Sequence, residues 1–275
     1  MFKNRFSSDF FFIYAVTFLL ALAILLPILV ILFGSCVNTS FLGISSEQWV
    51  GGGDGFITMK WYRYVLGLYG SSMLFSLKIA FMTVIACLLV GVPGSYVLAS
   101  KPFFGSRLIE ELVLLPLSVP GIVMSIALIQ AYGRLRGHWW FLLAGHLVYT
   151  IPFMVRSITN TLRSFDIGRL ELAAQNLGAG FWQRLWLVVL PNLRHAMIIG
   201  CLLVFAISWG EFNVSFLLNT PLNQTYPAAL YGTYTSNSFQ VSSAATAIFL
   251  LGLLPVLIAI QWLGGDDLVK IEQGS

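Results

Sequence analysis

The residue of this sequence best placed to do chemistry is an acid that interrupts an apolar segment. Glu211 lies in the run ISWGEFN, beside Ser208, Trp209 and Asn213. Ionisable side chains at membrane depth usually face a bundle interior or an aqueous cavity, and they are functional candidates for that reason. We therefore predict that Glu211, with Trp209, Asn213 and Ser208, lines a route for a cationic or zwitterionic solute. A purely structural hydrogen bond to a neighbouring helix, or exposure at the outer rim, stays open as an alternative.

The other ionisable or nucleophilic residues form no catalytic or metal-binding set. Glu110 and Glu111 begin an apolar segment, where acids suit a helix N-terminus. His146 is a single imidazole in an apolar segment, and it is best interpreted as a packed donor between helices. No CxxC or Cys/His metal spacing occurs, and no Ser/His/Asp or Cys/His catalytic set is recognisable. The cysteines are interpreted as small packing residues: Cys36, Cys87 and Cys201.

The composition indicates that the elements which position these residues lie in a membrane. The chain has 275 residues, of which 58% are hydrophobic and 9% charged, whereas soluble domains carry about 25% charged residues. A helix needs about 20 apolar residues to cross a bilayer. We therefore predict an all-α membrane protein with one domain, 1–275, and a core at 72–264. Six spans are expected, at 10–34, 72–99, 108–132, 139–158, 194–218 and 243–264.

The distribution of basic residues predicts the orientation of these spans. An even number of spans puts both termini on one side, and ten of the 15 Lys and Arg residues fall on that side. Basic residues are enriched in cytoplasmic loops, so both termini are predicted to be cytoplasmic. The loops 35–69 and 219–242 then face outward, and Gly51–Gly55 is interpreted as flexible turn material. The first apolar run is longer than that of a signal peptide, so it is expected to be a retained helix.

One predicted cytoplasmic segment, 163–192, interrupts the apolar spans of the chain. It contains ELAAQNLGAGFWQRLWLVVLP, in which Asp166 can cap a helix and Gly178 can end it in a left-handed turn. Helical spacing places small and apolar side chains on one face, at Leu170, Ala173, Ala174 and Leu177. Such a helix could lie on lipid headgroups or dock into a groove on another protein. The pattern alone leaves both possibilities open.

This segment resembles the EAA loop of ABC importer permease subunits. Ala173-Ala174, Gly178, Val188 and Leu190-Pro191 fall at the spacings of that motif. Leu172 stands where the family has its glutamate, and Glu171 lies one position earlier. The resemblance implies a coupling helix between the fourth and fifth transmembrane helices, which docks into the ATPase subunit. The docking residues it implies are Glu171, Leu172, Ala173, Ala174, Leu177, Gly178, Ala179, Leu190 and Pro191.

Two further stretches carry the resemblance. Residues 76–129 are similar to the core of type I importer permeases, with prolines at familiar positions, and 55–62 are similar to spermidine/putrescine-type permeases. The resemblance implies a bacterial inner membrane location and a polyamine or related amino compound as substrate. Iron, sulfate or phosphonate stay open as substrates within the same superfamily. The implied partners are a second permease subunit, an ABC ATPase dimer, a periplasmic solute-binding protein and membrane lipid, but no nucleic acid.

The sequence has no nucleotide-binding loop of its own. None of its five lysines follows a glycine, so the pattern GxxxxGK[ST] is absent. We therefore expect the chain to be a non-catalytic subunit without a cofactor, while ATP and Mg²⁺ bind to the partner ATPase. A self-contained secondary transporter is the alternative from another class, and it would carry inverted repeats and more intramembrane acids. A purely structural membrane protein is a third, but it would not need the glycine-broken segment.

Overall fold

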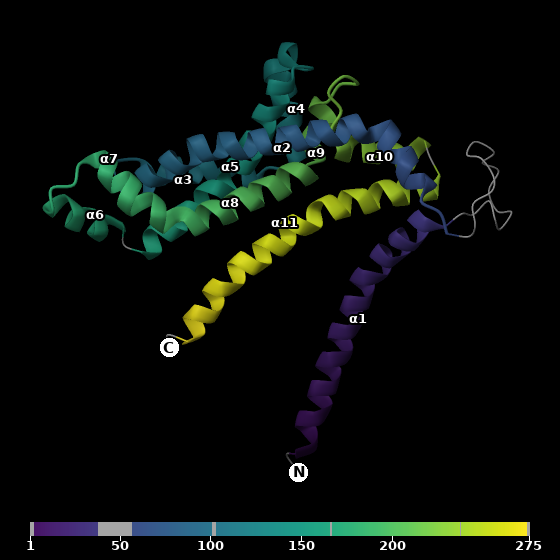
Figure 1. Ribbon diagram of the computed structural model, residues 1–275, viewed down its shortest axis with the longest axis horizontal. Helices are drawn as coiled ribbons and strands as arrows, with labels where there is room; N and C mark the ends of the chain where they lie inside the picture. Colours follow the sequence, from purple (N-terminus) through teal and green to yellow (C-terminus); the bar gives the residue numbers. More distant parts are fainter. Residues whose placement is uncertain (1–2, 38–56, 101–102, 166, 237, 274–275) are drawn as a thin grey trace. The chain divides into compact units, whose positions relative to one another are not determined.

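The computed structural model describes residues 3–37, 57–100, 103–165, 167–236 and 238–273, and nearly all of them are helical (Figure 1). Within these ranges, extended residues pair only in an isolated bridge between Val37 and Ile57. The predicted all-α class is confirmed. The elements are α1 (Lys3–Cys36), α2 (Lys60–Ser100), α3 (Ser106–Leu114), η2 (Leu115–Ser118), α4 (Gly121–Tyr132), η3 (Gly133–Leu135), α5 (Trp139–Ser164), α6 (Ile167–Asn176), α7 (Phe181–Arg184), the π-helical η4 (Leu185–Val189), α8 (Leu190–Gly210), α9 (Asn213–Leu218), α10 (Tyr226–Ser236) and α11 (Phe239–Gln273).

The described helices cover the predicted spans, and two of these spans, 108–132 and 194–218, are broken. Five helices are long and apolar enough to cross a membrane, and a sixth crossing is available if a bent pair counts as one span. The five are Phe12–Cys36, Lys60–Ala99, Trp139–Ser164, Phe181–Gly210 and Phe239–Leu263.

The third predicted span, 108–132, is two helices and not one. Its halves, Ser106–Ser118 and Gly121–Leu135, are bent by 107°. The break falls at Val119, which is extended with φ −98° and ψ 125°. The ring of the following Pro120 disfavours the helical conformation for the residue before it, which explains the break.

Two predicted outer loops are partly helical. The helix α2 begins at Lys60, so 60–69 belongs to a helix, and α10 lies within 219–242. The predicted cap at Asp166 and the glycine-rich turn at 51–55 lie outside the described residues.

The chain divides into two compact units, and the predicted single domain stays a prediction. The first unit comprises Met1–Gly70 and Leu230–Leu250, and the second comprises Ser71–Ala229 and Leu251–Ser275.

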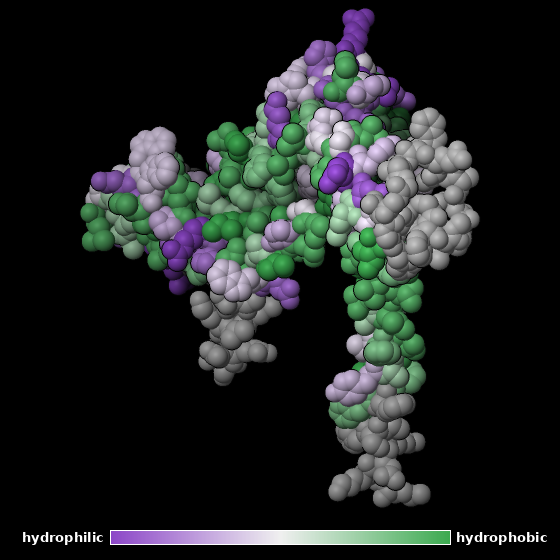
Figure 2. All heavy atoms as spheres, turned by 45° about the vertical axis from the view of Figure 1, so that its right-hand side comes forward, coloured by the Kyte–Doolittle hydropathy of each residue, from purple (hydrophilic) through white to green (hydrophobic). Residues whose placement is uncertain are grey.

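In the first unit, α1 is tied to the start of α2 by polar contacts at its C-terminal end. The hydroxyl oxygens of Ser35 and Tyr62 are 2.7 Å apart, and the indole N–H of Trp61 donates to the Val37 carbonyl at 3.1 Å. Elsewhere α1 is uncovered: none of its most apolar stretch is buried, and Figure 2 shows hydrophobic side chains along it. An unpacked apolar helix of this kind is typical of a segment that faces lipid or another protein.

The second unit contains the core that holds the candidate site. Figure 1 shows α2, α5 and α8 running alongside one another, and their buried side chains Cys87, Met154, Ile158 and Leu193 form one cluster. The helices α5 and α8 approach closely because Gly200 has no side chain: a Cβ there would lie 2.7 Å from the Met154 sulfur. Close-packed cores of this kind move as rigid bodies and do not deform continuously.

Candidate functional site

The first candidate region is the segment from α6 to the start of α8, residues 167–191, which we call the α6–α7 segment. The helix α6 ends in a glycine turn: Gly178 has φ +84° and donates to the Gln175 carbonyl, and Ala179 donates to the Ala174 carbonyl at 3.0 Å. This pair of hydrogen bonds is a Schellman motif, which a glycine permits without strain. The left-handed turn predicted at Gly178 is confirmed.

The face of α6 that was predicted to be apolar is largely uncovered. On this face Leu177 is 89% exposed and Leu170 42%, whereas Ile167 at the first turn is buried; Leu172, on a different side of the helix, is 61% exposed. Of the two alanines, Ala173 is exposed and Ala174 is half-buried, as is Ala179 after the turn. Exposed apolar side chains on a short capped helix form a ready surface for a second molecule.

A hydrogen bond to α2 holds α6 in place. The phenolic O–H of Tyr96 donates to the Oε1 atom of Glu171 at 2.6 Å. Tyr96 is buried and Glu171 is half-buried. Glu171 therefore has a partner inside the chain, while its neighbour Leu172 points to the exposed side. Sequence reasoning missed Tyr96, because 75 residues separate the pair and no pattern links them.

The second half of the segment is an aromatic stretch that leads into α8. The rings of Phe181 and Trp182 meet edge to face with centroids 5.5 Å apart, and Trp182 and Trp186 are 68% and 64% exposed. The chain then widens into the π-helical turn η4, and α8 follows with Leu190 half-buried and Pro191 exposed at its start. Pro191 has no amide hydrogen for the preceding turn, which fits the widening at this point. Pro191 thus lies at the start of α8, inside the candidate span Phe181–Gly210.

The second candidate region is the break between α8 and α9, which we call the α8–α9 junction. The helix α8 ends at Gly210, and Glu211 is extended with φ −72° and ψ 111°. The Oε2 atom of Glu211 accepts hydrogen bonds from the backbone N–H groups of Val214 and Ser215, at 2.8 and 2.9 Å. The carboxylate is buried and caps the start of α9. The predicted span 194–218 is thus interrupted at the acid, and one carboxylate oxygen already has structural partners.

A buried histidine links the two sides of this break. His146 lies on α5 and is 1% exposed. Its Nδ1 atom is 2.8 Å from the Ser208 hydroxyl on α8, and its Nε2 atom is 2.9 Å from the Ser215 hydroxyl on α9. Ser208 also donates to Thr83 on α2 at 3.4 Å. The interpretation of His146 as a packed interhelical group is confirmed, although its contacts with Ser208 and Ser215 were not foreseen.

The other predicted pathway residues lie at the same junction. Trp209 is buried, and its ring stacks parallel to Phe205 with centroids 6.4 Å apart. Asn213 packs against α4, because a Cβ on Gly121 would lie 3.0 Å from the Asn213 Cβ. The structure therefore gathers Ser208, Trp209, Glu211 and Asn213 in one region. Their role toward a solute stays a prediction.

Comparison with known proteins supplies a context for this geometry. Residues 91–265 match the family described as "Binding-protein-dependent transport system inner membrane component". The "Molybdenum transport system permease protein ModB" of Haemophilus influenzae is 31% identical over 226 residues, which cover 74% of this chain and 97% of the relative. The "Spermidine/putrescine transport system permease protein PotC" of Escherichia coli K12 is 29% identical over 248 residues, 88% of this chain and 89% of the relative. A solved bacterial ABC transporter involved in the import of the acidic polysaccharide alginate shares the fold, with a TM-score of 0.66 and 21% identity over 96% of this chain and 99% of that one.

Proposed function

This chain belongs to the family of binding-protein-dependent transport system inner-membrane components, as a multi-pass permease subunit of a type I ABC importer, and we propose that its α6–α7 segment couples it to a separate ATPase dimer. In this proposal the chain forms half of a translocation pathway. A second permease subunit forms the other half, and a periplasmic solute-binding protein delivers the substrate. ATP and Mg²⁺ bind to the ATPase subunits, and this chain holds no cofactor of its own.

The observation that carries the proposal is the uncovered apolar surface on α6. Leu177 projects from the predicted apolar face of a helix whose end is fixed by the Gly178 turn and whose flank is held by Tyr96. A rigid helix that presents apolar anchors suits a groove on a partner protein, because little conformational freedom is lost on binding. The docking residues of the proposal are Glu171, Leu172, Ala173, Ala174, Leu177, Gly178, Ala179, Leu190 and Pro191.

The connections of α6 provide a route for motion into the membrane part of the chain. The helix α6 follows α5 directly, and the segment ends where α8 begins. Because α5 and α8 pack closely at Gly200 and Met154, a displacement of α6 would move both helices together. We infer that closure of the ATPase dimer on ATP shifts this helix pair, and that the α8–α9 junction at their far end opens or closes the pathway to solute.

Copurification tests the partner assignment. Affinity purification of the tagged chain should recover an ATPase subunit that carries the nucleotide-binding motif in stoichiometric amount. Recovery of the folded chain alone, under conditions that preserve other membrane complexes, would contradict the proposal. Leu172→Glu serves as a companion variant: it restores the acid at the motif position, whereas Glu171 keeps its bond to Tyr96. If Leu172 is a docking contact, this variant should weaken assembly with the ATPase, whereas unchanged complex stability and ATPase coupling would show that position 172 is neutral.

We further propose a polyamine or related amino compound as the substrate. In support, Glu211 is a buried acid at the junction, and a relative that matches 88% of this chain carries the spermidine/putrescine name. The ModB relative keeps a metal oxyanion open as the alternative, beside the iron, sulfate and phosphonate expected for the superfamily.

Glu211→Gln tests whether the negative charge of this acid acts on a cationic substrate. The glutamine keeps an acceptor oxygen for the N–H groups of Val214 and Ser215 but removes the negative charge. For a cationic substrate, ATPase activity stimulated by the loaded binding protein should fall while assembly stays normal. Unchanged kinetics would remove Glu211 from the pathway, and binding assays on the cognate solute-binding protein would then decide the substrate.

The proposed location is the bacterial inner membrane, with both termini in the cytoplasm. The excess of basic residues on that side supports this orientation. A C-terminal fusion to a reporter that works only in the cytoplasm should be active, and a fusion to a reporter that works only in the periplasm should not.

A further inference from the structure

Two adjoining cavities of the second unit lie where α2 ends, α3 begins and α5 ends, away from the α8–α9 junction. The first has a volume of about 360 Å³ and is polar, with Ser106, Arg107, Glu110 and Arg163 in its wall. The second has a volume of about 420 Å³ and is lined almost entirely by apolar side chains, among them Val97, Phe103 and Ile109. Leu98 belongs to both walls, so the two cavities meet at this residue.

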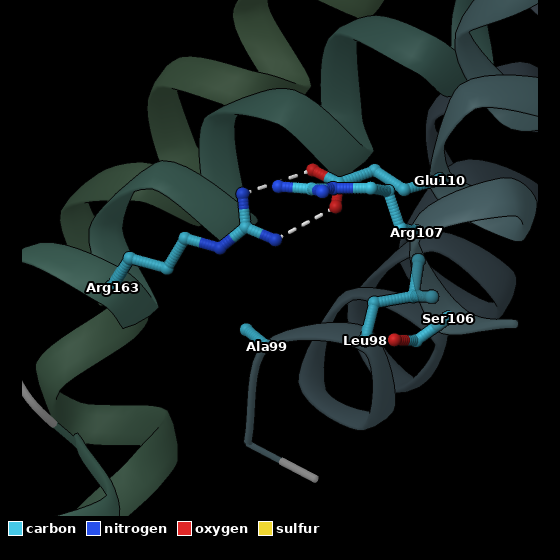
Figure 3. Close-up of a pocket in the computed structure, with 6 residues that line it drawn as sticks. All are labelled: Leu98, Ala99, Ser106, Arg107, Glu110 and Arg163. Atoms are coloured by element: carbon cyan, nitrogen blue, oxygen red, sulfur yellow. Dashed lines mark hydrogen bonds and ion pairs between the residues drawn. The ribbon is translucent and has the colours of Figure 1, made fainter. Parts of the chain in front are cut away.

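The polar cavity carries an excess of positive charge. Figure 3 shows the side chains of Arg107 and Arg163 extending toward one carboxylate, that of Glu110. Arg163 forms a bidentate ion pair with Glu110, at 3.0 and 2.7 Å. Within the part of the chain that the structure describes, the side chain of Arg107 has no hydrogen bond or ion pair. Two guanidinium groups around one carboxylate leave a net charge of one positive unit for an anion.

The start of α3 adds hydrogen-bond donors to the same place. Gly105, with φ +90°, turns the chain into α3, and no side chain caps the helix. Its first-turn N–H groups at Arg107 and Leu108 have no intrahelical acceptor, because the ladder begins with Ile109 donating to Gly105. Uncapped N–H groups beside guanidinium groups and a serine hydroxyl are the donor set that a phosphate oxygen prefers.

We propose that the two cavities together bind one anionic phospholipid, with its phosphate at Arg107, Arg163 and Ser106 and an acyl chain in the apolar cavity. The adjoining polar and apolar walls match the two chemistries of a single lipid molecule. Neighbouring surface residues agree with lipid contact: Phe104 is fully exposed, and Leu108 and Leu112 are 60% and 56% exposed on α3. A free phosphate would use the polar cavity only, and a partner protein would not require the charge.

Lipid binding to the full importer complex tests this site. The probes are fluorescent phosphatidylglycerol and zwitterionic phosphatidylcholine, with excess inorganic phosphate as a competitor. Wild-type protein should retain phosphatidylglycerol more tightly than phosphatidylcholine. Arg107→Gln should weaken phosphatidylglycerol binding about fivefold, since one basic side chain near a membrane surface contributes roughly 1 kcal/mol. Arg136→Gln, an exposed arginine outside the two cavities, should change nothing.

Two further variants test the role of the apolar cavity and the role of the charge on Glu110. A Cβ at Gly94 would meet no atom within 4 Å, so Gly94→Leu should fill the apolar cavity without distorting α2 and should weaken lipid binding. Glu110→Gln frees Arg163 for the phosphate and should strengthen it; the ion pair is partly exposed, so its loss should be tolerated.

Four results would overturn the proposal. They are equal retention of both lipids, equal behaviour of Arg107→Gln and Arg136→Gln, displacement of the lipid by inorganic phosphate, and a photo-crosslink from position 107 to a protein subunit in place of lipid.

Discussion

The α6–α7 segment exposes apolar side chains, whereas the α8–α9 junction buries polar ones. The α6–α7 segment leaves Leu177, Trp182 and Trp186 uncovered and places them at the surface of the chain. The α8–α9 junction buries His146, Ser208, Glu211 and Ser215, and each has a hydrogen-bond partner within the chain.

This difference separates what the chain completes by itself from what it leaves for another molecule. Buried polar groups are costly unless they are paired, so the junction is a finished structure with a defined geometry. Exposed apolar side chains on a capped helix gain stability only when a second surface covers them. The comparison predicts that changes at the junction act on folding and transport, whereas changes on the exposed surface of the α6–α7 segment act on assembly with the ATPase.

The largest effect is expected from Leu177→Asp. A charged group in the proposed docking surface should weaken association with the ATPase by about 2 kcal/mol or more, as for a central interface residue. Stability of the chain should not change, because Leu177 makes little contact within it. Affinity capture and a melting curve check the two parts. A lower melting temperature with normal capture would reverse the assignment of this residue.

Gly145→Ala should act on folding alone. A Cβ at this position would lie 2.8 Å from side-chain atoms of both Leu218 and Val214, so the helices must separate. We expect a loss of about 1–3 kcal/mol, the usual cost of overpacking. Gly67→Ala is the matched control: its Cβ meets no atom within 4 Å, and alanine should stabilise the helix slightly. Similar melting curves for the two variants would show that the packing around Gly145 is not tight.

His146→Leu should have a smaller effect on stability. It removes the partner shared by Ser208 and Ser215, and hydrogen bonds between membrane helices average about 0.6 kcal/mol each. The expected loss is therefore about 1 kcal/mol, with a larger fall in transport because the break is no longer held. His138→Leu, in an exposed turn, is the control. Normal transport by His146→Leu would show that the junction does not need this link.

Tyr96→Phe should change stability about as little as His146→Leu, and its main effect should be on coupling. It removes the hydrogen bond to Glu171, which is worth roughly 0.5–1.5 kcal/mol at most, and keeps the ring in its packing. The looser α6 should raise ATPase activity without bound substrate relative to transport. Glu171→Ala, which removes the acceptor, should behave alike, whereas Leu172→Gln should not. An unchanged ratio of hydrolysis to transport in Tyr96→Phe would exclude a coupling role for this bond.

The sequence predicted the helical class, the approximate spans and the turn at Gly178, because these depend on local composition and spacing. It did not predict the break at Val119 as a bend of 107°, since prolines within apolar segments are also tolerated as mild kinks. Nor did it predict the contacts of Glu171 and Glu211. Glu171 finds its partner through tertiary packing and Glu211 through a local break in the helix. Helical periodicity predicts neither contact.

The central claim, that the uncovered face of α6 docks onto an ATPase subunit, is tested most directly by site-specific crosslinking. A photo-crosslinking amino acid at position 177 should give an adduct with a protein that contains the nucleotide-binding motif, and the yield should change when ATP closes the dimer. The same group at position 222, where Leu222 is 94% exposed outside the segment, should not give that adduct. Adducts formed only with lipid would contradict the claim and favour an interfacial helix.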